Sequence, residues 1–151
     1  MKIEKERKFL MKNFPNNKPD KILLITQKYD SEGYRYRETL TFNNDIPEYV
    51  HEKIKKVKVD KGINHETEIE TISREQYLKA KCDKTISKER HIFNYEGKVF
   101  ELDHFYRNSL IILEVENVDI DEEINFPDFL KKRILIEVTG MPEFDNINLA
   151  S

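Results

Sequence analysis

The feature that most constrains this sequence is a two-residue alternation of side-chain character that recurs in short segments. In residues 1–9 one set of alternate positions holds Ile3, Lys5, Arg7 and Phe9, and the other set holds Glu4, Glu6 and Lys8. In a β-strand alternate side chains point to opposite faces of the sheet. The segment is therefore predicted to be a strand with one face made of two acids and a base. Such a face either meets solvent or lines a lumen.

Further strand-like segments are separated by turn residues, as in a chain of hairpins. Residues 21–29 contain a short apolar run that fits a strand or a brief helix. Ser73 and Gln76 have the spacing of a capping box and predict a helix from Arg74 to about Lys81, and Asp128 to Lys132 fits a helical turn. The other strand candidates are 34–42, 66–72, 85–95, 98–106, 109–117 and 135–139.

About eight short strands with one or two helices predict a mainly β, α+β fold. Many strands carry charge on one face and apolar or aromatic side chains on the other. A closed antiparallel barrel with helices packed outside would let the charged faces line its lumen. We therefore expect an eight-stranded antiparallel closed β-barrel formed by a single domain, residues 1–151.

Composition narrows the classes of partner. The chain has 151 residues, 29 acids and 26 bases, and a formal net charge of −3, which gives no reason to expect nucleic acid or a membrane surface as a partner. No apolar run is long enough for a membrane span. The single cysteine, Cys82, cannot form an internal disulfide, so a cytoplasmic location is expected.

Paired acids recur at alternate positions, as Glu4/Glu6, Glu66/Glu68, Glu68/Glu70 and Glu114/Glu116. The last pair lies in an apolar strand candidate. A buried pair of carboxylates is costly unless a cation compensates it. Mg²⁺ and Mn²⁺ prefer oxygen ligands, so convergent carboxylates would suit either ion.

Paired bases occur at the same spacing, as Arg35/Arg37 and Lys88/Arg90. An Arg fork matches phosphate oxygens bidentately, and Lys supplies a point charge. Each pair alone is more often a solvated strand face. Acids and bases that line one lumen would bind a metal-chelated polyanion.

In their order along the chain, these motifs resemble those of the CYTH domain, also called the triphosphate tunnel metalloenzyme superfamily. The opening Glu4-x-Glu6-x-Lys8 resembles the family signature, and Arg35-x-Arg37 resembles its Arg-x-Arg strand. Lys56 or Lys58 falls where a tunnel lysine is expected. The remaining similar motifs are Glu66-x-Glu68, Lys88-x-Arg90, Asp103 in its strand, Glu114-x-Glu116, Phe126-Pro127 and a closing segment with Glu137-Val138-Thr139, Asn146 and Leu149.

The resemblance implies a triphosphate tunnel, dependence on Mg²⁺ or Mn²⁺, and hydrolysis of triphosphate-containing substrates. It implies catalytic roles for Glu4, Glu6 and Lys8, and it makes Glu66 and Glu68 further acids of the tunnel. The implied metal ligands are Glu4, Glu6, Asp103, Glu114 and Glu116. The implied phosphate ligands are Lys8, Arg35, Arg37, Lys58, Lys88 and Arg90.

The chain departs from the family pattern near its end, where Gly140-Met141-Pro142-Glu143 replaces a segment with an arginine at the place of Glu143. The base that often precedes the middle acidic pair is also replaced, by Asn64 and His65. We expect an inorganic triphosphatase that converts tripolyphosphate to pyrophosphate and phosphate, as a monomer or homodimer. The alternatives are a class IV-type adenylate cyclase and a non-catalytic module that binds polyphosphate or nucleotide.

Overall fold

The computed structural model describes residues 2–151, and its main feature is one antiparallel sheet of eleven strands. Residue Met1 lies outside the described part. The strands are β1 (Lys2–Met11), β2 (Lys21–Tyr29), β3 (Arg35–Asn43), β4 (Ile46–Ile54), β5 (Lys56–Asp60), β6 (Ile63–Glu66), β7 (Glu70–Thr71), β8 (Lys84–Tyr95), β9 (Lys98–Phe105), β10 (Ile111–Glu116) and β11 (Ile134–Glu137).

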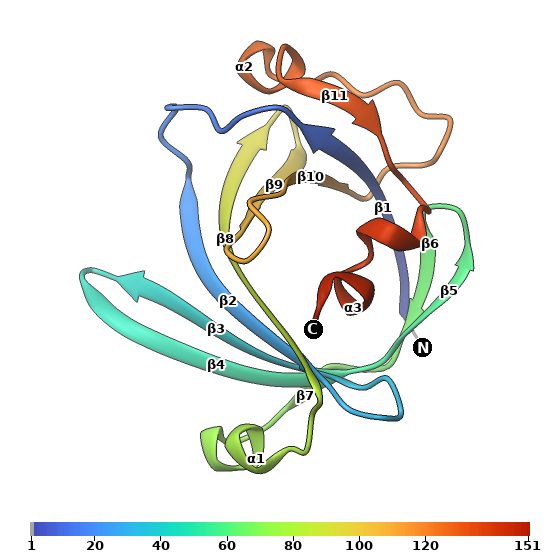
Figure 1. Ribbon diagram of the computed structural model, residues 1–151. Helices are drawn as coiled ribbons and strands as arrows, with labels where there is room; N and C mark the ends of the chain where they lie inside the picture. Colours follow the sequence, from blue (N-terminus) through green and yellow to red (C-terminus); the bar gives the residue numbers. More distant parts are fainter. Residues whose placement is uncertain (1) are drawn as a thin grey trace.

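The sheet is strongly curled, as the ring of ribbons in Figure 1 shows. Its strand order is β5-β6-β1-β10-β9-β8-β2-β3-β4-β7, and β11 pairs with β1 beside this path. Strand pair β5–β6 stands at one end of this order and strand pair β4–β7 at the other. The two pairs are close in sequence, because only Lys55 separates β4 from β5. The backbone N–H of Thr67 donates to the carbonyl of Lys55 at 3.0 Å, so the two strand pairs meet at this residue.

The predicted antiparallel, mainly β character is confirmed, and the number of strands differs from the expected eight. The expected strand at 66–72 is interrupted, because β6 ends at Glu66 and β7 begins only at Glu70. The segment 21–29, for which strand and helix were both open, is strand β2. Its alternating burial follows its register with β3 and β8 on either side.

Register explains how the charged faces come together. In the β1–β10 ladder, Glu6 lies opposite Glu116 and Lys8 lies opposite Glu114. Directly opposed residues of an antiparallel pair point to the same face. The acid and base positions of the strands thus share the concave face of the curled sheet.

The main apolar core lies on the convex face instead. Phe9 and Met11, which alternate with the charged residues of β1, pack there with buried residues of β8, β9 and β10 and with Leu130 of α2 (Asp128–Lys131). A second cluster on the concave side joins Tyr29, Ile86, Phe105 and Ile112 to the C-terminal segment.

The helices differ in where they lie. Helix α1 (Arg74–Lys79) has the predicted capping box between Ser73 and Gln76. Helices α1 and α2 both lie outside the ring in Figure 1, on opposite sides of it. Helix α3 (Asn146–Leu149) follows the 3₁₀ turn η1 (Pro142–Phe144) and lies inside the ring. The expectation that all helices pack outside is therefore wrong for α3, whose apolar side chains cover the second cluster. Within residues 2–151, every helix is too short to cross a membrane.

Candidate active site

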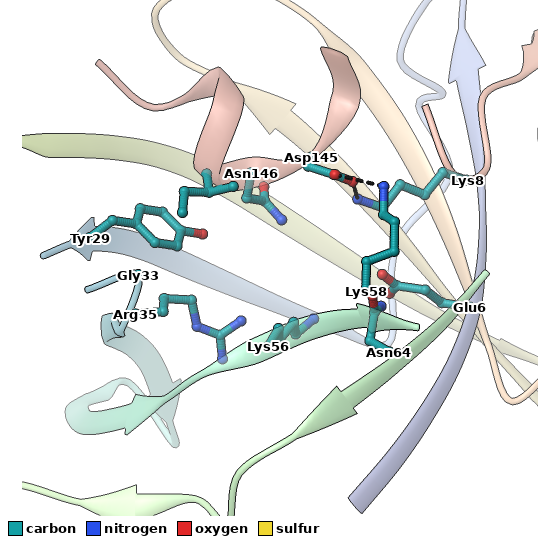
Figure 2. Close-up of a pocket in the computed structure, with 11 residues that line it drawn as sticks. Glu6, Lys8, Tyr29, Gly33, Arg35, Lys56, Lys58, Asn64, Asp145 and Asn146 are labelled. Carbon is teal, nitrogen blue, oxygen red and sulfur yellow. Dashed lines mark hydrogen bonds and ion pairs between the residues drawn. The ribbon is translucent and has the colours of Figure 1, made fainter. Parts of the chain in front are cut away.

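A cavity of about 210 Å³ opens on the concave face of the sheet. Strands β1, β2, β3, β5 and β6, the turn after β2 and the C-terminal segment supply its lining, and Figure 2 shows their side chains converging. The lining residues are Glu6, Lys8, Tyr29, Gly33, Arg35, Lys56, Lys58, Asn64, Asp145, Asn146 and Ile147.

Acids of three strands form one wall beside this cavity. The carboxylates of Glu4, Glu6 and Glu116 lie close enough for one oxygen of each to be within 4.8 Å of the others. Glu101 and Glu114 form a second group of the same kind with Glu116. Oxygen donors converging at such distances match the preference of Mg²⁺ and Mn²⁺.

The acids differ in how their charge is compensated. Burial and the neighbouring Glu114 carboxylate raise the pKa of Glu6 to about 7. Burial, a shared hydrogen bond with Glu101 and the charge of Glu6 raise the pKa of Glu116 to about 11. Near neutral pH Glu116 is therefore protonated and Glu6 partly protonated, and a divalent cation bound there would displace these protons. This chemistry fits a metal site.

Glu4 and Glu114 have basic partners instead. Burial acts to raise the pKa of Glu4, but the Lys56 ammonium at 2.8 Å outweighs it, and the pKa is lowered. Burial is likewise outweighed at Glu114, where Lys8 and Arg90 hold the pKa well below its usual range. These two carboxylates are charged near neutral pH.

Asp103, which the family resemblance assigns to the metal, lies elsewhere in the charge network. It is fully buried and pairs with Lys88 at 2.7 Å and with Arg90 at 2.7 Å. It belongs to neither group of converging acids among the described residues. Its neighbour on the same face of β9, Glu101, takes that place.

Most of the expected phosphate-binding bases are already paired with acids. Arg90 pairs with Glu101 and Glu114 as well as with Asp103. Lys8 lies 3.8 Å from Glu114 and 3.6 Å from Asp145. Lys58 pairs with Asp145 at 2.9 Å, so in Figure 2 this one carboxylate joins two lysines.

Arg35 differs from these bases. Its side chain is buried, its Nε has no hydrogen-bond partner, and no ion pair is recorded for it within residues 2–151. Burial lowers the pKa of its guanidinium below the usual range. A buried cation without a counter-ion is costly unless an anion binds beside it. Arg37, two residues along β3, donates to the neutral side chain of Gln27.

Glu66 and Glu68, which the family resemblance places in the tunnel, lie in different environments. Glu66 is buried beside Glu4 and Lys56, and burial together with the Glu4 charge raises its pKa. Glu68 is exposed, because strand β6 ends at Glu66 and the alternation stops there. The structure therefore does not bring Glu68 to the cavity.

Near the C-terminus, the residue at which the sequence departs from the family pattern is not the one that reaches the cavity. Glu143, in the 3₁₀ turn, is exposed. The acid that enters the cavity is Asp145, and Asn146 beside it accepts a hydrogen bond from Lys88 at 3.1 Å. Neither residue lies in an alternating segment, so no periodicity marks them. Glu101 and Gln27 do lie in alternating segments, on the same faces as Asp103 and Tyr29.

Comparisons with known proteins bear on the fold. No protein-family model and no curated protein sequence matches the chain. A crystal structure of the inorganic triphosphatase NE1496 is similar at a TM-score of 0.61 and 24% identity, covering 99% of this chain and 95% of that one. Another crystal structure of NE1496 is similar at a TM-score of 0.60 and 23% identity, and the alignment covers 97% of each chain.

A third similar structure is that of a Bacillus halodurans protein provisionally described as an adenylate cyclase. It has a TM-score of 0.50 and 15% identity, and the alignment covers 79% of this chain and 83% of that one. These likenesses establish that the curled antiparallel sheet is a fold shared with both proteins.

Proposed function

We propose that this chain is a metal-dependent triphosphatase that hydrolyses tripolyphosphate to pyrophosphate and phosphate. The observation that carries the proposal is the division of one concave face into a wall of converging acids and a wall with two arginines, Arg35 and Arg37, that have no acid partner among residues 2–151. A polyanion chelated to a divalent cation is complementary to such a face. The similarity to the inorganic triphosphatase NE1496 supports the same activity.

The proposal includes closure of the sheet into an eight-stranded tunnel. Strands β4 and β5 read as one strand bent at Lys55, and β6 and β7 as its interrupted partner. With β11 set apart as a flanking strand, eight strands remain. The bent strand pairs with β3 through β4 and with β6 through β5, which supports a ring.

Glu4, Glu6 and Glu116 would hold Mg²⁺ or Mn²⁺, with Glu101 and Glu114 available as a second group. A bound cation would offset phosphate charge and lower the pKa of a bound water. Arg35 and Arg37 would orient phosphate groups through their forks. The Lys8 ammonium, between Glu114 and Asp145, would stabilise charge that develops on the transferred phosphoryl group.

A substrate screen tests this proposal. Tripolyphosphate, nucleoside triphosphates and thiamine triphosphate are each incubated with Mg²⁺ or Mn²⁺, and phosphate, pyrophosphate and cyclic nucleotide are measured together. We expect tripolyphosphate to be the preferred substrate, with pyrophosphate and phosphate in equal amounts. The fold shared with the provisional adenylate cyclase favours one alternative, for which ATP would yield cyclic AMP and pyrophosphate. Binding of tripolyphosphate without turnover would indicate a non-catalytic module.

Variants of the acid wall test the site. Glu4→Ala and Glu116→Ala should each abolish metal-dependent turnover, because each removes a carboxylate from the group that would hold the cation. Glu68→Ala is the matched control, since Glu68 is exposed and outside the cavity. Wild-type turnover by either wall variant at saturating metal would refute the assignment.

A further inference from the structure

The cations of the concave face differ in whether a carboxylate lies within ion-pair distance of them. Arg90 and Lys88 contact Asp103, and Lys8 contacts Glu114. The charge of each of these bases is offset by a carboxylate within ion-pair distance. A substrate anion must compete with that carboxylate for the base.

Arg37 makes different contacts. Its Nε and Nη2 donate to the side-chain oxygen of Gln27 at 3.0 Å and 2.6 Å, and no carboxylate pairs with it in the described part of the chain. An amide oxygen orients a guanidinium by hydrogen bonding but carries no net charge. Arg37 is thus held in place while its charge remains uncompensated.

Gln27 is itself fixed in orientation. It is fully buried, and its Nε2 donates to the hydroxyl of Tyr29 at 2.8 Å. The donor end of the amide is thereby assigned to Tyr29, and the acceptor end faces Arg37. Gln27 and Arg37 are also direct partners in the β2–β3 ladder, as are Tyr29 and Arg35.

We propose that Gln27 is a positioning residue whose uncharged oxygen orients Arg37 without neutralising it, so that Arg37 keeps its charge for a phosphate group of the substrate. The inference rests on the proposed function, since it assumes a polyphosphate ligand at this face. Glu has nearly the same shape and would bind Arg37 more strongly, because a carboxylate adds a full negative charge that pairs with the guanidinium, whereas the amide oxygen has no net charge. Gln27 therefore orients the Arg37 guanidinium as Glu would, but it does not neutralise its charge.

Gln27→Glu tests the inference, and Gln76→Glu is its control. Gln76 lies on α1 outside the sheet, and Glu also serves at that position of a capping box, so the control makes the same change of charge away from the cavity. Binding of tripolyphosphate is measured by calorimetry in EDTA, which prevents turnover. We expect Gln27→Glu to bind about tenfold more weakly, while Gln76→Glu binds as the wild type does.

The kinetic readout separates positioning from structure. Gln27→Glu should raise KM by about the same factor and change kcat less, and its melting temperature should equal or exceed that of Gln27→Met. If Gln27 served only for packing, Gln27→Glu would leave binding unchanged, because Glu has nearly the same shape. Unchanged binding by Gln27→Glu would overturn the inference.

A double-mutant cycle guards against misfolding of the Glu variant. Because Gln27 acts through Arg37, Gln27→Met should weaken tripolyphosphate binding in the wild-type background but not in an Arg37→Met background. Equal losses in both backgrounds would overturn the inference. Failure of the wild-type protein to hydrolyse tripolyphosphate with Mg²⁺ or Mn²⁺ would refute the proposed function itself, and so would be distinguished from failure at Gln27.

Discussion

Arg35 illustrates how a single residue can favour ligand binding at the expense of stability. Its buried guanidinium has an unpartnered Nε and no recorded ion pair within residues 2–151. Desolvation of such a cation opposes folding, and the charges of Glu66 and Glu4 offset it only in part, because the pKa of Arg35 stays below its usual range. A bound phosphate would supply the missing partner. Binding and stability should therefore respond oppositely to the loss of this charge.

We predict that Arg35→Met makes the ligand-free protein more stable. The free energy of unfolding should rise by about 1 to 3 kcal/mol, because an unpaired buried cation is replaced by an apolar side chain of similar length. Tripolyphosphate binding should be lost. Urea titration and calorimetry measure the two effects. Arg74→Met, at an exposed position of α1, is the control and should change stability by less than about 0.5 kcal/mol. A destabilised Arg35→Met would contradict the prediction.

We also predict that affinity for Mg²⁺ or Mn²⁺ falls as pH falls through neutrality. Burial and Glu114 raise the pKa of Glu6 to about 7, and burial raises that of Glu116 to about 11, so both carboxyls hold protons that a cation must displace. Lower pH favours the protonated, metal-free form. Affinity should drop by about tenfold per pH unit for each displaced proton, as measured by calorimetry between about pH 6 and pH 8.

Glu6→Gln provides the control for this pH dependence. It removes one titrating carboxyl, so it should weaken metal binding and also flatten the dependence on pH. Dissociation constants that do not change over this range would show that neither carboxyl carries a proton in the metal-free protein.

At the scale of elements, β11 illustrates how a short flanking strand is attached. It pairs with the end of β1, and Arg7 of β1 donates to both carboxylate oxygens of Glu137 at 2.9 Å. The hydroxyl of Thr139 donates to the same carboxylate at 2.6 Å. The bidentate pair therefore connects the last strand to the first, across most of the chain.

We predict that Glu137→Gln destabilises the protein by about 1 kcal/mol near neutral pH. The hydrogen bond from Arg7 lowers the pKa of Glu137 below its usual 4.5, despite partial burial. The contribution of this pair to the free energy of unfolding is therefore fully present above about pH 4.5. It is lost as the pH falls through the lower pKa that Glu137 has in the folded protein. The difference between variant and wild type should shrink in acid.

Urea titrations of both proteins at neutral and acidic pH check this, with Glu123→Gln as the control. Glu123 is exposed and has no recorded ion pair in the described part of the chain. A difference that stays the same in acid would mean that the ion pair is not its source.

For the whole molecule, the sequence predicts the strands that surround the cavity better than the C-terminal segment that enters it. Alternation identifies β1, β3 and β8 as strands, and register then brings Glu6 and Glu116 together. Which strands pair depends on long-range contacts, so the grouping of Glu6 with Glu116 was implied only by the family resemblance. Glu68 was misplaced because alternation does not reveal where a strand stops.

The C-terminal segment could not be placed from sequence. Asp145 and Asn146 follow a turn and precede a helix of four residues, and their contacts are with Lys8, Lys58 and Lys88, far away in the chain. Such contacts arise from the curl of the whole sheet. No local periodicity encodes them: the family resemblance includes Asn146 but not Asp145, and Glu143, the departure seen in the sequence, is exposed.

We predict that Asp145→Asn binds tripolyphosphate more tightly, by about tenfold. The change frees both Lys8 and Lys58 from their shared carboxylate, and it costs no helix cap, because the Asp145 side chain makes no cap hydrogen bond. Calorimetry in EDTA measures the affinity. Glu143→Gln makes the same charge change at an exposed position of the same segment and should leave affinity unchanged. Equal or weaker binding by Asp145→Asn would contradict the prediction.

Because Asp145 is part of the chain, its competition with other anions for Lys8 and Lys58 does not depend on dilution. A buffer anion that occupied the same two lysines would leave as the solution was diluted, but a carboxylate tethered to the chain has a fixed effective concentration there. Every incoming anion competes with this internal ligand at the same strength in any preparation. Apparent affinities are then reduced by a constant factor that no dialysis removes.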